Sequence, residues 1–294
     1  MPAYSVLITG LISISSASVL IRLAEAPIVI IAASRLTIAA LIVGPPSLGI
    51  YRKDLPKLSW PFFMTCVVAG AFLAFHFLFW IASLNLTSVL SSAVFVTSHP
   101  ILIAFLGPVF IRRETFSWRV CIYALLAVLG AAILTIGDAA KLGQALFGDM
   151  LAFLGAVMMS GYLLVGRRLT KHIPLPLYLT IVYSSASIIL IGLVVTLDAP
   201  VFGYTNNTYL YLLSIAIFPQ VIGHSLINWA LRRWSAIFVS VTIVSEPVIA
   251  SILAAVFLGE VPSLIAVFGG IIILTAIYLT GAFETRNQRK HFLE

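Results

Sequence analysis

Five ionisable side chains lie inside long apolar runs of this 294-residue chain. They are Arg35, His76, His99, His224 and Glu246. Placing such a group at the middle of a bilayer costs about 2.5–3.5 kcal/mol on insertion scales, so it usually faces a protein interior or a water-filled cavity. These residue types can bind anions, bind cations or exchange protons. The pattern therefore predicts a polar site enclosed by apolar segments.

Helical spacing groups some of these residues with other polar or aromatic side chains. Gln220, His224 and Asn228 recur every four residues, which places them on one side of a helix. We expect this face to meet water or a ligand. A second face with the same spacing consists of Phe72, His76 and Trp80.

Other interpretations of the same residues stay open. A membrane histidine can serve only as a hydrogen-bonding group between helices, worth about 0.6 kcal/mol on average, and this applies above all to His99. Arg35 lies in the outer part of its apolar run, so it can also pair with backbone carbonyls or extend to the membrane surface. The remaining aromatic residues near His76 are expected to face lipid: Phe75, Phe77 and Phe79.

Glu246 is followed directly by Pro247 within an apolar run, and Pro100 occupies a similar place after His99. A proline inside a membrane helix removes a backbone donor and kinks the helix, so Pro100 and Pro247 are candidate hinges. Glu246 then serves as counter-ion to a substrate, as a coupling group that exchanges protons, or as a neutral group bonded to a neighbouring helix. With His99 as a positive end, the pair suits a zwitterion.

Composition shows which elements must position these residues. The chain is 61% hydrophobic and 9% charged, with a mean hydropathy of +1.13. Soluble domains are nearer one-quarter charged, and runs of about 20 apolar residues span a bilayer. The sequence predicts an all-α polytopic membrane protein with ten transmembrane helices, at Ala3–Arg22, Pro27–Tyr51, Leu58–Leu84, Ser88–Ile111, Trp118–Gly137, Gly148–Arg167, Leu175–Leu197, Tyr209–Leu231, Ser235–Leu258 and Val261–Phe283.

Basic residues indicate the orientation of these spans, because cytoplasmic loops carry an excess of lysine and arginine. With both termini inside, Arg22 and Lys141 lie on the outer side and Arg35 lies within a span. The other fourteen of the 17 basic residues lie inside: Arg52, Lys53, Lys57, Arg112, Arg113, Arg119, Arg167, Arg168, Lys171, Arg232, Arg233, Arg286, Arg289 and Lys290. We therefore expect N- and C-termini that are both cytoplasmic.

The two halves of the chain repeat one another. Five pairs of like or corresponding residues occur in order at offsets of 146 to 148 residues: Arg22 with Arg168, Pro27 with Pro174, His76 with His224, Pro100 with Pro247, and Glu114 with Glu260. His99 corresponds likewise to Glu246. Each half has five predicted spans, an odd number, so the halves enter the membrane in opposite senses. Such inverted repeats are common in transporters.

These features resemble the EamA branch of the drug/metabolite transporter superfamily. The resemblance rests on the ten spans in two inverted halves, Arg35 in ASRLTIAAL, the prolines of the fourth and ninth spans, and the glutamates of RRETFSWR and LGEVPSL. It implies a central cavity surrounded by the first four spans of each half, with the fifth and tenth spans at the periphery. It also implies bacterial export of amino acids or other small metabolites. The repeat mate of Arg35 is Val182, beside Tyr183, so the halves differ there.

Together these observations predict one transporter domain over residues 1–294, with repeats at about 1–138 and 148–284 and a cytoplasmic tail at 285–294. We expect export of an amino acid or similar zwitterionic solute across the inner membrane by alternating access. One alternative is an organophosphate or nucleotide-sugar exchanger, but a dianion calls for several cavity cations and only Arg35 is available. The other is a membrane-embedded enzyme, but hydrolysis needs a positioned nucleophile and base or a pair of acids, and Glu246 is the sole mid-span carboxylate. Expected partners are a small solute, lipid and protons if transport is proton-coupled; no cofactor, metal or nucleic acid is expected, and the chain is a monomer or homodimer. The predicted substrate-binding residues are Arg35, Phe72, His76, Trp80, His99, Gln220, His224, Asn228 and Glu246.

Overall fold

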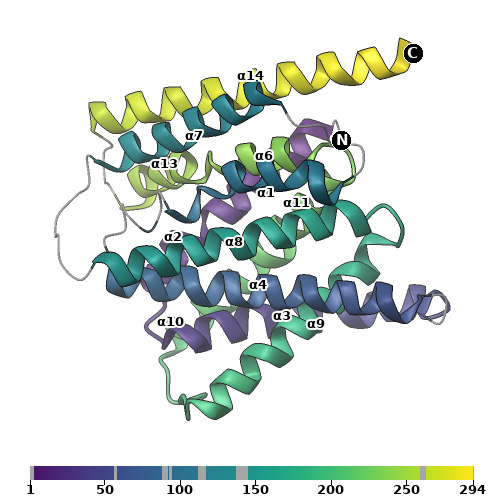
Figure 1. The fold of residues 1–294 in the computed structure, drawn as a ribbon. Coiled ribbons are helices and arrows are strands. Elements are labelled where there is room, and N and C mark those ends of the chain that lie inside the picture. The colour runs from purple at the N-terminus through teal and green to yellow at the C-terminus, as the bar shows by residue number, and fades with distance from the viewer. Residues whose placement is uncertain are drawn as a thin grey trace.

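Helices form all the regular structure in the part of the chain that the computed structural model describes, which is residues 3–55, 58–87, 92, 95–111, 117–136, 145–258 and 263–293 (Figure 1). The described helices of the first half include α1 (Ala3–Ser15), α2 (Ala17–Leu23), α3 (Ile28–Tyr51), α4 (Trp60–Leu86), α6 (His99–Phe110) and α7 (Trp118–Ile136). Glu114 and Glu260, the repeat-related glutamates, lie outside the described residues, as do Ser88, Gly137 and Val261 at the ends of three predicted spans.

The second half is also built from a mixture of long and interrupted helices. It contains α8 (Ala145–Leu169), α9 (Leu175–Thr196), α10 (Asn206–Ile215), the π-helix η2 (Ala216–His224), α11 (Ser225–Leu231), α12 (Ala236–Ile243), α13 (Glu246–Leu258) and α14 (Leu264–Leu293). Local chemistry fixes several of the starts. The Thr205 side chain accepts a hydrogen bond from the backbone N–H of Thr208 at 3.2 Å, and Ser235 accepts one from Phe238 at 3.1 Å. Both are N-caps that satisfy an otherwise unpaired donor.

Seven helices among the described residues are long and apolar enough to cross a membrane. Three more apolar helices are shorter: His99–Phe110, Trp118–Ile133 and Ala236–Ala250. Each lies within one of the predicted spans. A polytopic, all-helical chain is thus what the structure shows over these ranges, and the count of ten spans stays a prediction.

Two of the predicted spans are broken at their prolines. In the fourth, Thr97 and Ser98 form a turn and α6 begins at His99; in the ninth, α12 ends at Ile243 and α13 begins at Glu246. A proline ring clashes with the carbonyl four residues before it but is tolerated in the first turn of a helix, so the helix restarts just before each proline. His99 and Glu246 therefore each stand at the first residue of a helix. That end of a helix favours a negatively charged side chain.

A third interruption is the π-helix η2, which contains Pro219. Widening the helix by one residue per turn accommodates a ring that would otherwise collide with the preceding turn, and such segments are frequent at functional sites. Gln220 and His224 both belong to η2, whereas Asn228 lies in α11. The regular α-helical spacing expected for these three residues therefore does not hold between Gln220 and His224, which lie in the wider π-helix.

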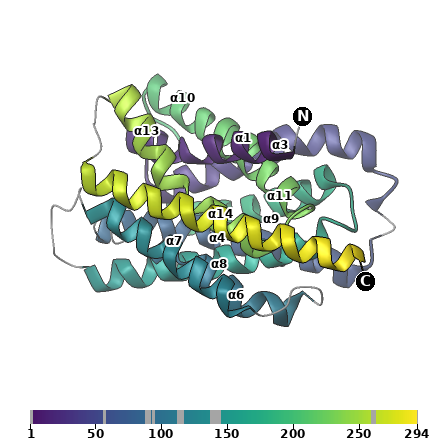
Figure 2. The same ribbon diagram turned by 90° about the horizontal axis from the view of Figure 1, so that it is seen from above.

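Equivalent helices of the two halves pack against one another. α3 packs on α9 and α7 packs on α14, which pairs the second span with the seventh and the fifth with the tenth. α4 of the first half packs on α8 of the second half. The contact related to it by the internal repeat is that of α1 with η2 and α11. Figure 2 shows α14 and α7 running together along one face of the bundle. Both ends of the chain lie on the same side of the helical array, with the turns between α3 and α4 and between α8 and α9 (Figure 1).

Glycines allow the closest of these contacts. A Cβ atom added at Gly130 in α7 would stand 2.9 Å from the carbonyl oxygen of Gly269 in α14. Ala127, Ala131 and Ala266 are buried in the same interface. The small residues of α7 and α14 thus join two helices of one chain, a close approach that membrane helices commonly use.

Gly70 offers a test of packing. A Cβ at this position in α4 would meet the Ser185 side chain and stand 2.6 Å from the carbonyl oxygen of Val182 in α9. Gly70→Ala should therefore destabilise the protein by about 1–3 kcal/mol, the usual scale of overpacking. The measurement is the midpoint of thermal unfolding in detergent. Gly192→Ala is the control, because nothing lies within 4 Å of its added Cβ; equal midpoints for the two variants would contradict the described α4–α9 contact.

Candidate functional site

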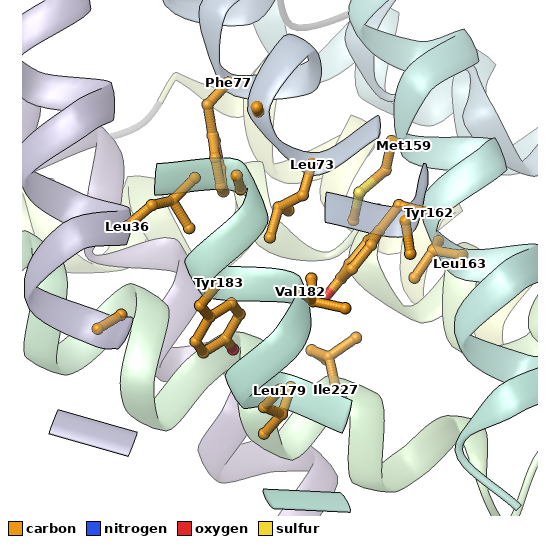
Figure 3. Close-up of a cluster of buried hydrophobic side chains, with 14 of the residues drawn as sticks. Leu36, Leu73, Phe77, Met159, Tyr162, Leu163, Leu179, Val182, Tyr183 and Ile227 are labelled. Atoms are coloured by element: carbon orange, nitrogen blue, oxygen red, sulfur yellow. The ribbon is translucent and has the colours of Figure 1, made fainter. Parts of the chain in front are cut away.

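A cluster of buried apolar side chains surrounds several of the predicted polar residues. Phe77, Tyr162 and Tyr183 are among its fully buried members. Figure 3 shows the rings of Tyr162 and Tyr183 on either side of Val182. Phe77 is 1% exposed, so the expectation that it faces lipid is wrong. Its ring instead faces inward and contacts Arg35 and His224.

Arg35 lies in α3 and is 1% exposed. Its Nε donates a hydrogen bond to Oε1 of Gln220 at 2.6 Å, and its guanidinium carbon lies 3.9 Å from the centroid of the Phe77 ring. The cation therefore gains both a charge-assisted hydrogen bond and a cation–π contact. Arg35 does not extend to the membrane surface, and Nε donates to a side-chain amide rather than to a backbone carbonyl.

Gln220 is also contacted from α9, which belongs to its own half of the chain. The hydroxyl of Tyr183 in α9 donates a hydrogen bond to the backbone carbonyl of Gln220 at 3.3 Å and lies 3.2 Å from Oγ of Ser225. Because Tyr183 adjoins Val182, the repeat mate of Arg35, corresponding parts of α3 and α9 converge on the π-helix. This convergence joins an arginine from one half to a tyrosine from the other. Sequence analysis assigned Tyr183 no role beyond its position beside Val182.

His76 lies on the face of α4 that meets α8. Its Nδ1 lies 2.9 Å from the carbonyl oxygen of Gly155, and its ring stacks on Trp80 with centroids 6.2 Å apart and an interplanar angle of 11°. A carbonyl only accepts, so Nδ1 carries the proton and Nε2 is the acceptor. Phe72 packs against Gly161, where an added Cβ would stand 2.8 Å from the ring. The predicted face of Phe72, His76 and Trp80 is thus brought together along α8.

His224 and Asn228 are both buried against α8 and α4. The edge of the His224 ring meets Phe77 at a centroid distance of 5.3 Å. Asn228 donates from Nδ2 to the hydroxyl of Tyr162 and to the backbone carbonyl of His224, the latter at 2.7 Å. Tyr162, which anchors this end of the site, was not predicted. Nothing in its sequence neighbourhood distinguishes it from other apolar-segment tyrosines.

His99 connects the two broken helices. Its Nδ1 lies 2.9 Å from Oγ of Ser240 in α12, and its backbone carbonyl accepts a hydrogen bond from Ser160 at 3.4 Å. α6 and α12 pack on one another at this point. His99 is therefore placed to hydrogen-bond between helices, which is one of the roles that sequence analysis left open.

Glu246 is half-buried at the start of α13. Within the described part of the chain its carboxylate forms no hydrogen bond and no ion pair. Among the described residues, Arg35 is the charged side chain that acts on it electrostatically, and Glu246 acts on Arg35 in turn. The two opposite charges thus influence one another without forming an ion pair.

Several buried polar atoms of this cluster have no hydrogen-bond partner in the described structure. Those within the site are Arg35 Nη1, Gln220 Nε2, His224 Nδ1 and Asn228 Oδ1. Most buried polar groups in proteins are satisfied, so such a concentration indicates that a polar ligand or water completes the site. Among the described residues no group of three or more histidine, cysteine, aspartate or glutamate side chains is placed to hold a metal ion.

Apolar helices that enclose a buried polar cluster, with two helices broken at prolines beside it, define a membrane-transporter class of fold. The family model described as "EamA-like transporter family" matches residues 1–136 and 146–282, once for each half. The chain therefore belongs to the EamA-like transporter family, which confirms the resemblance seen in the sequence.

One solved crystal structure of a protein shares this fold, with a TM-score of 0.80. The match covers 97% of this chain and 98% of the other at 18% sequence identity. At that identity the likeness concerns the fold alone. No curated protein matches the chain.

Proposed function

We propose that this protein is a secondary transporter that exports a small organic metabolite, an amino acid or similar zwitterionic solute, across the bacterial inner membrane. The observation that carries the proposal is the buried pair of Arg35 and Gln220, whose Nη1 and Nε2 donors have no acceptor among the described residues, together with the half-buried Glu246, which interacts electrostatically with Arg35. Such a site offers complementary groups to a solute with both charges. The family match supports transport as the activity.

The mechanism we propose is alternating access between two inverted halves of five spans each. The packing of equivalent helices from the two halves against one another supports this mechanism, because a two-state rearrangement of one half then has a counterpart in the other. Pro100 and Pro247 serve as hinges, since each stands at a break directly beside a site residue. His76, His99, His224, Asn228, Phe72 and Trp80 complete the binding site around Arg35, Gln220 and Glu246. No chemical step is proposed, because Glu246 is the one mid-span carboxylate.

A ligand screen tests the proposed substrate class. The midpoint of thermal unfolding of the purified protein is measured with amino acids, amines, nucleotides and sugar phosphates, because a ligand that binds the folded state stabilises it. We expect stabilisation by one or more amino acids and none by sugar phosphates or nucleotides. Stabilisation by sugar phosphates alone would instead support the exchanger that the scarcity of cations argues against.

Orientation is tested by reporter fusions. With ten spans and both termini inside, a reporter after Glu294 should be active only as a cytoplasmic fusion and one inserted near Gly143 only as a periplasmic one. The basic residues near the described helix ends support this arrangement, including Arg167, which donates to the backbone carbonyl of Leu231 at 2.7 Å. The reverse activities at the two positions would exclude the ten-span topology.

A further inference from the structure

Arg35 and Gln220 present adjacent hydrogen-bond donors that lack acceptors. The Nε of Arg35 can only donate, so the atom of Gln220 that faces it must be the amide oxygen. The amide nitrogen, Nε2, is then left without a partner, as is Nη1 of Arg35. Both residues are almost fully buried, at 1% and 0% exposed. Buried donors without acceptors are costly, so the pair calls for an acceptor supplied from outside the chain.

The surroundings hold both donors in place. The Phe77 ring supports the guanidinium from one side, and the Tyr183 hydroxyl binds the backbone carbonyl of Gln220. A planar guanidinium beside an amide matches the planar, two-oxygen shape of a carboxylate better than that of a single-atom anion. This geometry favours an organic acid group as the missing acceptor.

Glu246 supplies the opposite charge. Its carboxylate interacts electrostatically with Arg35 but forms no ion pair with it, and it has no hydrogen-bond donor within the described residues. His99, which the sequence suggested as the positive end of the site, is instead engaged by Ser240. Arg35 is therefore the cation that acts on Glu246. Two opposite charges that are not paired with one another suit a ligand that carries one charge of each sign.

We propose that Arg35 and Gln220 bind the carboxylate of the transported solute and that Glu246 binds its ammonium group. This assignment rests on the proposed function and defines its substrate as a compact zwitterion with both charges free. Esterifying or amidating the carboxylate, or acylating the amine, should each abolish recognition.

Three pooled probes test the assignment on the purified full-length protein: the free amino acids, their carboxamides, and their N-acetyl derivatives. Pools are used because the side chain of the substrate is not part of the assignment. Thermal midpoints are recorded against pool concentration to obtain apparent affinities. The wild type should respond to the free amino acids and to neither derivative.

Two charge-removing variants should change selectivity in opposite ways. Arg35→Gln should weaken the response to free amino acids by about 10- to 100-fold, the scale of a lost charge-assisted hydrogen bond, and should no longer distinguish them from the carboxamides. Glu246→Gln should lose the distinction between free and N-acetyl amino acids instead. A merely structural role for either residue would not produce this reciprocal pattern.

Gln220→Glu provides a second route if Arg35→Gln does not fold. It keeps Arg35 but places a carboxylate against its guanidinium, so it should weaken amino acid binding as strongly as Arg35→Gln. Arg52→Gln is the matched control, because Arg52 is an exposed arginine that caps the end of the same helix. It should behave as the wild type.

Three outcomes would overturn the assignment while leaving transport intact: equal stabilisation of the wild type by amino acids and carboxamides, an unchanged amino acid response in both Arg35→Gln and Gln220→Glu, or stabilisation only by solutes without a carboxylate. If no solute stabilises the protein and liposomes containing it release none, the proposed function fails together with the assignment.

Discussion

Replacing Glu246 with glutamine is expected to weaken substrate affinity by about 1.5–3 kcal/mol in reconstituted protein, the usual scale of a hydrogen bond to a charged group. Glutamine keeps the shape of the side chain but removes the charge that acts electrostatically on Arg35. Both substrate exchange and gradient-driven uptake should therefore show a raised half-saturation concentration. The two assays are run side by side on the same preparation of proteoliposomes.

Different patterns in these assays identify the other roles of Glu246. If the residue carries a coupling proton, the variant keeps exchange but loses accumulation driven by a pH gradient, because the carrier can rearrange without binding a proton. Wild-type behaviour in both assays would remove Glu246 from the mechanism and leave it as a neutral helix contact. Glu25→Gln serves as the control, since Glu25 is an exposed glutamate in the turn before α3.

His224→Ala and Asn228→Ala should each lower transport by about 2- to 10-fold at unchanged membrane abundance, as expected for the loss of one hydrogen bond to a ligand. The reason is that His224 Nδ1 and Asn228 Oδ1 are buried yet unpaired, so a solute or bound water can use them. Transport per molecule is measured with abundance determined on the same membranes. Loss of abundance with normal transport per molecule would make both residues structural. His172→Ala, at an exposed histidine of the α8–α9 turn, should have no effect.

Much of the helical arrangement could be predicted from hydropathy and from the internal repeat, because both act through local composition. The sequence predicted kinks at Pro100 and Pro247, because a proline ring crowds the preceding turn, and each of these spans is broken just before its proline, at His99 and Glu246. The π-helix around Pro219 was not predicted. Its extra residue depends on how α10 and α11 pack against α1 and α3, which the local pattern does not contain.

Most residues of the candidate site could be predicted from the sequence, but their contacts with one another could not. The cost of burying a charge predicted that Arg35 faces the interior, yet its partner Gln220 is 185 residues away in the chain. Phe77 was assigned to lipid because an apolar side chain fits either environment, and only the position of Arg35 selects the inward orientation. The glycines of α8 that receive His76 and Phe72 likewise act through tertiary packing alone.

Release of solutes from proteoliposomes tests the central claim most directly. Liposomes containing the wild type, Arg35→Gln, Glu246→Gln or no protein are loaded with a mixture of amino acids, amines, nucleotides and sugar phosphates, and the solutes released are measured by mass spectrometry. We predict that wild-type liposomes release one or a few amino acids faster than protein-free liposomes, and that both variants reduce this release. Release that equals the protein-free rate for every solute, or that is the same in the wild type and both variants, would contradict the account.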